Sequence, residues 1–116
     1  MKIERRETGP RMSKAVIHGD TVYLSGLVAD SPKGKNTAEQ TKSILSQIDG
    51  FLATAGTDKS KLLSANIWLT DMATFAEMNA VWEAWVSPGN TPARATVEAR
   101  LASPDYKVEI MVVAAR

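Results

Sequence analysis

Apolar and polar residues alternate along several stretches of the chain, and this period of two predicts strands with one buried face. The most regular stretch is TPARATVEARL at 91–101. One side of this predicted strand is polar and the other is apolar: Arg94, Thr96, Glu98 and Arg100 alternate with Ala95, Val97, Ala99 and Leu101. We expect the apolar side to be the buried one.

Five further stretches are strand-like: MKIERRE at 1–7, residues 15–18, residues 21–28, KLLSANIWLTD at 61–71 and YKVEIMVVAAR at 106–116. Gly19-Asp20 separates the second from the third, which predicts a hairpin with a two-residue turn. Each of the last two strands is expected to bury one face. In the strand at 61–71 this face carries Leu63, Ala65, Ile67 and Leu69. In the strand at 106–116 it carries Val108, Ile110, Val112 and Ala114.

Two other stretches have the 3.6-residue period of amphipathic helices. The first is predicted over 36–56, because Asn36 and Glu39 fit a capping box and Gly56 is a common helix end. The second is predicted over 72–86 and ends before Pro88-Gly89. The expected inward stripes are Thr41, Ile44, Leu45, Ile48, Leu52 and Ala55 in the first helix, and Phe75, Met78, Trp82 and Trp85 in the second.

The predicted order is β-β-β-α-β-α-β-β, an α+β fold with a six-stranded sheet. Two helices can cover only one face of such a sheet. The other face would mix apolar and polar side chains: Tyr23, Ser25, Leu27, Trp68, Arg94, Thr96, Glu109, Met111 and Val113. We expect this face to pack against other copies of the chain. A solvated face with scattered apolar residues is the alternative.

Composition narrows the class of protein. The chain has 116 residues, of which 44% are hydrophobic, so we expect one globular domain over 1–116. A net charge of +1 gives no support for a nucleic-acid surface. The charged N-terminus does not resemble a signal peptide, and no apolar run has the length of a membrane helix. We therefore expect a cytoplasmic protein that does not bind membranes.

The residues that are missing disfavour several reaction classes. There is no cysteine and only one histidine, His18, so we expect neither a zinc or iron site nor a Ser-His-Asp triad. Neither of the glycine motifs that cradle phosphate groups, GxGxxG and the P-loop, occurs in the chain.

An arginine and a glutamate remain as candidates for chemistry. Arg94 follows TPA at the start of its strand, where a guanidinium can bind a carboxylate through two hydrogen bonds or form a surface salt bridge. Glu109 lies in the middle of the last strand. It is either a positioned acid or base, or an ion-pair partner of Lys107 or Arg100.

Weaker candidates are a serine-glycine pair and an asparagine. Gly26, after Ser25, either lets a ligand approach the backbone closely or marks a bulge. Asn79 lies on the rim of the apolar stripe of the second helix, where a solvated side chain is the ordinary interpretation.

Five segments together resemble the RidA/YjgF/YER057c/UK114 family: VYLSGLVA, EQTKSILSQIDGFLATAG, ANIWLTDMATFAEMNAVWEAW, TPARATVEARL and KVEIMVVA. The resemblance covers about residues 9–115. It implies a chorismate-mutase-like α+β fold and a homotrimer whose sheets pack into a central barrel, with ligand clefts between subunits. It also implies hydrolysis of reactive enamines and imines, such as 2-aminoacrylate or 2-iminopropanoate, to 2-keto acids and ammonia without a cofactor.

The resemblance also implies roles for the candidate residues. Arg94 matches the arginine that binds the substrate carboxylate, and Glu109 matches the glutamate associated with the attacking water. The remaining site positions would be Ser25, Gly26, Asn79 and the main-chain N–H of Thr96. The chain departs from the family pattern in lacking the tyrosine of G-P-Y near the start, and at Leu27, Thr96 and Met111.

Two other functions stay open. The first is non-catalytic or regulatory binding of small keto or amino acids, which the same Arg94 clamp would serve. The second is ribonuclease or translation-inhibitor activity, a label attached to some family members. The near-neutral charge and the lack of a histidine pair disfavour this second alternative.

Overall fold

The computed structural model describes all residues, 1–116, and has the predicted order of elements. The strands are β1 (Ile3–Thr8), β2 (Ser13–His18), β3 (Thr21–Leu24), β4 (Leu62–Leu69), β5 (Ala93–Glu98) and β6 (Val108–Ala115). The helices are α1 (Thr37–Thr54) and α2 (Phe75–Trp85), and short 3₁₀ turns at Lys59–Lys61 and Met72–Thr74 precede β4 and α2.

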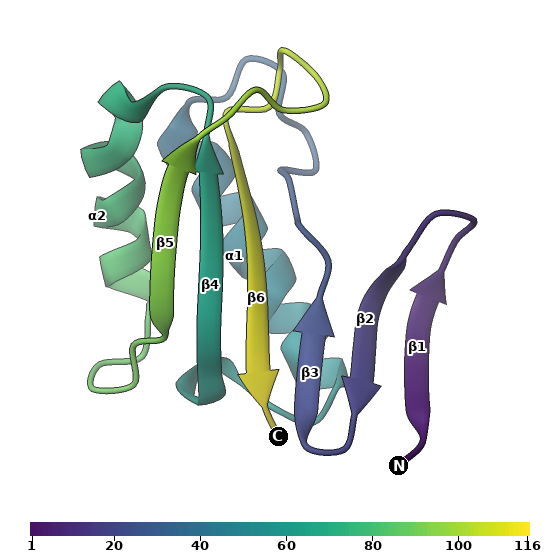
Figure 1. The fold of residues 1–116 in the computed structure, drawn as a ribbon. Helices are drawn as coiled ribbons and strands as arrows, with labels where there is room; N and C mark the ends of the chain where they lie inside the picture. The colour runs from purple at the N-terminus through teal and green to yellow at the C-terminus, as the bar shows by residue number, and fades with distance from the viewer.

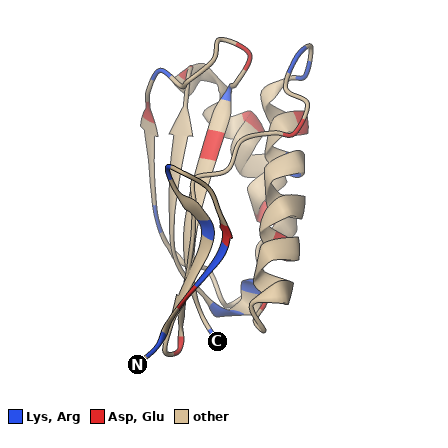
Figure 2. Ribbon diagram, turned by 90° about the vertical axis from the view of Figure 1, so that its right-hand side faces the viewer, with Lys and Arg blue, Asp and Glu red and all other residues tan.

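All six strands form one mixed sheet in the order β1-β2-β3-β6-β4-β5. Only β4 and β5 are parallel, and α2 supplies the crossover that a parallel pair requires. Both helices lie on the same face of the sheet, with α1 behind its centre and α2 beside the β5 edge (Figures 1 and 2). The opposite face, which we call the open face, has no covering element.

The core lies between the helices and the sheet. It is a single cluster of 21 buried residues, and it includes the predicted inward faces of α1 and β6. The predicted capping box of α1 is confirmed, because the Asn36 side chain accepts from the Glu39 amide at 2.8 Å and the Glu39 side chain accepts from the Asn36 amide at 3.1 Å. Neither helix has the combination of length and apolar character that crossing a bilayer requires.

The prediction for the start of β4 was wrong. Leu63 is 50% exposed, whereas Leu62 is buried together with Ala65, Ile67 and Leu69. The pairing of β4 with β6 shifts register between Leu62 and Ser64, which is a bulge that adds one residue and reverses the alternation.

The faces of β5 are also opposite to those predicted. Arg94, Thr96 and Glu98 pair in register with the buried residues of β4, so their side chains lie on the helix side of the sheet. Val97 lies on the open face and is 50% exposed. The reason is that β5 is an edge strand beside a short helix. The helix side of this edge is therefore partly solvated and accepts polar residues, while the apolar side lies on the open face.

Leu27 does not belong to the open face either. It is 2% exposed and pairs with Ile110 on the helix side. From Tyr23, which pairs with Val113, to Leu27 the chain has one residue more than the facing part of β6. The extra residue falls at Ser25-Gly26, so the bulge considered for this pair is present, and it turns Leu27 inward. On the second helix, Met78 and Trp82 are buried as predicted, but Phe75 is 38% exposed.

A buried glutamine holds two loops against the start of α1. Gln40 is fully buried, and its Nε2 donates to the carbonyls of Pro32, Lys35 and Asp105 at 3.0–3.2 Å. Its Oε1 accepts from the amide of Lys107 at 2.9 Å. This one side chain therefore fixes the loop before α1 and the loop that leads into β6.

Gln40→Leu should lower the free energy of unfolding by about 3 kcal/mol, because it removes four part-buried hydrogen bonds to backbone groups, each worth about 0.5–1.5 kcal/mol. Gln47→Leu is the matched control. Gln47 makes one hydrogen bond to a backbone carbonyl, that of Val28 at 2.9 Å, so its loss should cost about 1 kcal/mol. Urea denaturation at a fixed protein concentration measures both, and equal losses would show that Gln40 does not hold the loops.

Candidate functional site

Arg94 is held between two aromatic rings of α2. Its Cζ lies 5.4 Å from the centroid of the Trp82 ring and 6.0 Å from that of Phe75. The ion pair of the chain joins Arg6 to Glu4, so the salt-bridge interpretation of Arg94 is wrong. Packing against ring faces orients a guanidinium and leaves its N–H groups free, and these can bind a carboxylate in two places at once.

A backbone donor of β5 points to the same edge of the sheet. The amide of Ala99 donates to the carbonyl of Leu69 in β4 at 2.9 Å. Successive N–H groups of a strand point in opposite directions, so the N–H of Thr96 is directed away from β4 toward the free edge. Since β5 has no further strand beside it, this N–H is available to a ligand that Arg94 binds.

Three polar side-chain atoms are buried without a hydrogen-bond partner: Oγ of Ser25, Oδ1 of Asn79 and Oγ1 of Thr96. All three belong to the predicted site residues. Asn79 lies one turn from both Phe75 and Trp82 on α2, and Thr96 follows Arg94 on the face that α2 covers. A buried polar atom without a partner costs about 1–3 kcal/mol, and a ligand or a partner chain that binds it is one explanation for its presence.

Glu109 lies against Gly26 on the other side of the sheet. A Cβ atom built on Gly26 would overlap Oε2 of Glu109 and lie 3.1 Å from its Cδ. Glu109 pairs with Trp68 of β4, and both side chains lie on the open face of the sheet. It forms no ion pair with Lys107 or Arg100. The glycine therefore makes room for the carboxylate, which stands half-buried and unpaired over the backbone of the bulge.

The predicted site residues thus form two separate groups. Arg94, Thr96 and Asn79 make up the clamp half, at the β5 edge on the helix side. Ser25, Gly26 and Glu109 make up the acid half, at the bulge between β3 and β6. Strand β4 separates Arg94 from Glu109, which places their strands about 10 Å apart, and their side chains lie on opposite faces. One small ligand cannot touch both within a single chain.

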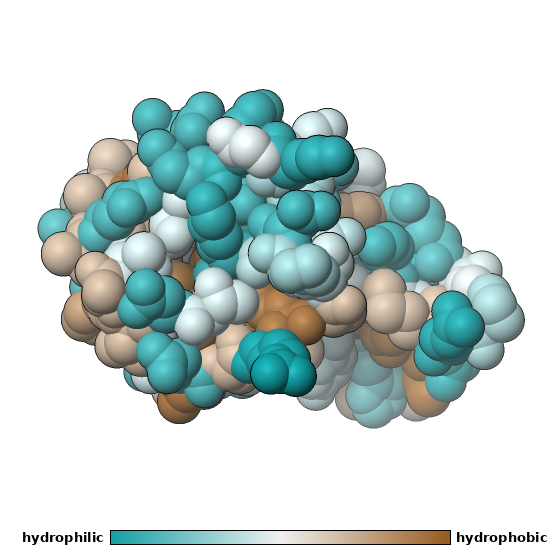
Figure 3. All heavy atoms as spheres, turned by 90° about the horizontal axis from the view of Figure 1, so that it is seen from above, coloured by the Kyte–Doolittle hydropathy of each residue, from teal (hydrophilic) through white to brown (hydrophobic).

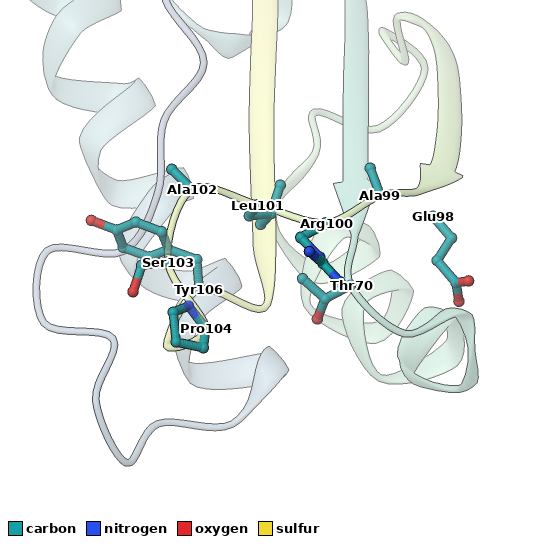
Figure 4. Close-up of a pocket in the computed structure, with 9 residues that line it drawn as sticks. All are labelled: Thr70, Glu98, Ala99, Arg100, Leu101, Ala102, Ser103, Pro104 and Tyr106. Atoms are coloured by element: carbon teal, nitrogen blue, oxygen red, sulfur yellow. The ribbon is translucent and has the colours of Figure 1, made fainter.

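The largest cavity coincides with neither half. It has a volume of about 820 Å³ and is formed by the loop from β5 to β6 together with Thr70 (Figure 4). From above, this end of the molecule is mostly hydrophilic, with apolar atoms showing in a hollow (Figure 3). A site shared between copies would be concave only in the assembly, so the cavity of one chain does not locate it. No group of three His, Cys, Asp or Glu side chains is placed to hold a metal ion.

Sequence reasoning missed the aromatic support of Arg94. Phe75 and Trp82 fit the apolar stripe of a helix, and their spacing gives no sign that a guanidinium packs on them. One feature of the sequence could have indicated it. The arginine begins an edge strand, and the helix before that strand carries two aromatic residues seven positions apart.

The chain is similar to known proteins over nearly its whole length, both in sequence and in fold. The model of the Endoribonuclease L-PSP family matches residues 4–116. The RutC family protein YoaB of Escherichia coli K12 is 44% identical, over 99% of each chain. The crystal structure of NMB1025 of Neisseria meningitidis, a member of the YjgF protein family, is 50% identical with a TM-score of 0.96, over 100% of this chain and 96% of that one.

Arg94→Ala should fold normally but bind pyruvate about 10–100-fold more weakly, because charge-assisted hydrogen bonds worth about 1.5–3 kcal/mol are lost. Arg94→Lys should restore little, since an ammonium cannot make the two-pronged contact. Arg5→Ala, which removes an exposed arginine of β1, is the control. Calorimetric titration measures the affinity of each of the three variants for pyruvate. Wild-type affinity in Arg94→Ala would show that the carboxylate of pyruvate does not bind at Arg94.

Proposed function

This chain belongs to the YjgF (RutC) protein family, and we propose that it hydrolyses reactive enamines and imines derived from amino acids to 2-keto acids and ammonia. Family membership supports an imine-deaminase-like or small-molecule-binding role. The observation that carries the proposal is the clamp half. It combines an unpaired guanidinium, fixed by two rings, with a free backbone N–H at the same sheet edge.

The reaction needs few groups. An enamine first takes a proton on its carbon and gives up one from its nitrogen, which makes it an imine whose C=N carbon is electrophilic. Water adds to this carbon with loss of a proton, and the nitrogen gains one, giving a carbinolamine. The hydroxyl proton is then transferred to the nitrogen, the C–N bond breaks, ammonia leaves and the C=O bond of the 2-keto acid forms. Holding the substrate by its carboxylate and moving protons between oxygen and nitrogen therefore account for the catalysis.

We assign these two tasks to the two halves. Arg94 and the Thr96 N–H hold the substrate carboxylate, which fixes the imine carbon beside them. Glu109 transfers to the nitrogen first a proton of the attacking water and then the hydroxyl proton of the carbinolamine. Its position over Gly26 leaves both carboxylate oxygens without a partner from the chain.

The two halves can act on one substrate only if they come from two copies of the chain. We infer that open faces pack together in a homotrimer, so that the β5 edge of one copy meets the bulge of the next. Exposed apolar residues on the open face support this arrangement, because Tyr23 is 47% exposed and Val97 50%. Trp68, Met111 and Val113 extend the same face between them.

Non-catalytic binding of a keto or amino acid would use the clamp half alone. Turnover of freshly generated 2-iminopropanoate separates the two functions, since a binder would leave the spontaneous hydrolysis rate unchanged. The family name Endoribonuclease L-PSP finds no support in side-chain chemistry here, because the single histidine, His18, is exposed at the end of β2, away from both halves.

Glu109→Gln should lower the deaminase rate by about 10²–10⁴-fold, the usual range for loss of a general acid–base. Affinity for pyruvate should stay as in the wild type, because the clamp half is untouched. Glu83→Gln, on the exposed side of α2, is the control. A lower thermal midpoint with a normal specific rate would instead assign Glu109 a structural role.

Gly26→Ala should keep the fold but lose at least about tenfold in deaminase rate, because the new methyl group displaces the Glu109 carboxylate, whose flexible end can swing away. Gly50→Ala is the matched control. Gly50 lies in α1 with open space around it, so alanine there should stabilise the protein by about 1 kcal/mol and leave the rate unchanged. Normal turnover in Gly26→Ala would remove the acid half from the mechanism.

A further inference from the structure

We propose that the cavity under the loop from β5 to β6 is a second anion site, which binds an organic carboxylate with an apolar body through Arg100. The cavity is separate from the clamp half and from the acid half, and the proposal does not depend on deaminase activity. Its volume of about 820 Å³ lies within the range of small-molecule sites.

Arg100 supplies an unneutralised positive charge in this cavity. It forms no ion pair. The one carboxylate in the lining, Glu98, is used elsewhere, because its Oε1 accepts from the amide of Met72 at 2.8 Å. In Figure 4, Glu98 points away from Arg100, and the guanidinium lies toward Thr70. A guanidinium with free N–H groups in a hollow is suited to a carboxylate.

The loop that forms the cavity is fixed at both ends. Before it, the amide of Ala99 bonds to the carbonyl of Leu69, and after it the amide of Thr70 bonds to the carbonyl of Lys107 at 3.1 Å. Within it, the amide of Tyr106 bonds to the carbonyl of Ser103 at 3.2 Å. The Nε2 of Gln40 also donates a hydrogen bond to the carbonyl of Asp105 at 3.0 Å. A ligand therefore meets a preformed surface and loses little free energy in ordering it.

The rest of the lining sets the class of ligand. Apolar groups come from the Leu101 and Pro104 side chains, the ring of Tyr106 and two alanines, while Thr70, Ser103 and Tyr106 carry hydroxyl groups (Figure 4). A single arginine beside an apolar wall fits one carboxylate attached to an aliphatic or aromatic body. Inorganic phosphate has the charge but no apolar body, so it should bind more weakly.

Titration of the ¹⁵N-labelled full chain with 3-phenylpropionate tests the site. In the wild type, saturable shifts of the backbone amides of residues 99–106 are expected. They should persist in Arg94→Gln, which lacks the clamp, and in Arg5→Gln, a matched exposed arginine outside the cavity. Arg100→Gln should weaken binding at least about tenfold, the effect of one lost charge-assisted contact, with deaminase activity unchanged.

Three results of the 3-phenylpropionate titration would overturn the proposal. They are the absence of saturable shifts in the wild type, their loss in Arg94→Gln, and their persistence at wild-type affinity in Arg100→Gln. Phosphate serves as the second probe: weaker binding than 3-phenylpropionate supports an organic carboxylate, and equal or tighter binding contradicts it. A failed deaminase assay with an intact Arg100 site would count against the proposed function alone.

Discussion

Side chains of a strand alternate between the two faces of a sheet, and this constraint decides how the candidate site must be built. Arg94 is in register with Ala65, which is buried beneath the helices, and Glu109 is in register with Trp68 on the open face. A shift of one residue in β6 would bring Glu109 to the side of Arg94, but it would also turn the core residues of β6 outward. The core therefore fixes Glu109 on the open face, and catalysis by both halves as they are placed here requires a second copy of the chain.

The buried polar atoms of the site are consistent with such a division. Ser25, Asn79 and Thr96 each leave one side-chain atom buried without a partner, whereas Gln40, equally buried, satisfies its amide completely. The structural glutamine thus finds its hydrogen bonds within the chain, whereas these three site residues leave polar atoms for a ligand or a partner copy to bind.

Much of the fold follows from the sequence because alternation and helical period reflect burial directly. The α1 stripe, the capping box at Asn36 and the buried face of β6 were predicted correctly. Errors arose where an extra residue reverses the alternation, at Leu63 and Leu27, and at the β5 edge, where a polar face lies under a helix. Arg94, Glu109, Ser25, Gly26 and Asn79 were candidates from the sequence itself, whereas their roles and the N–H of Thr96 were implied by the family resemblance. The distribution of these residues over two faces, and the rings that hold Arg94, depend on tertiary pairing that no local pattern encodes.

Mixing two inactive variants tests the division of the site between copies most directly. Arg94→Ala and Glu109→Gln would be unfolded, combined in equal amounts and refolded, so that subunits assort at random. If each site takes its clamp half from one copy and its acid half from the next, about a quarter of the sites should contain both wild-type residues, and the mixture should regain about a quarter of the wild-type deaminase activity. Activity no higher than that of the separate variants would contradict a site shared between copies.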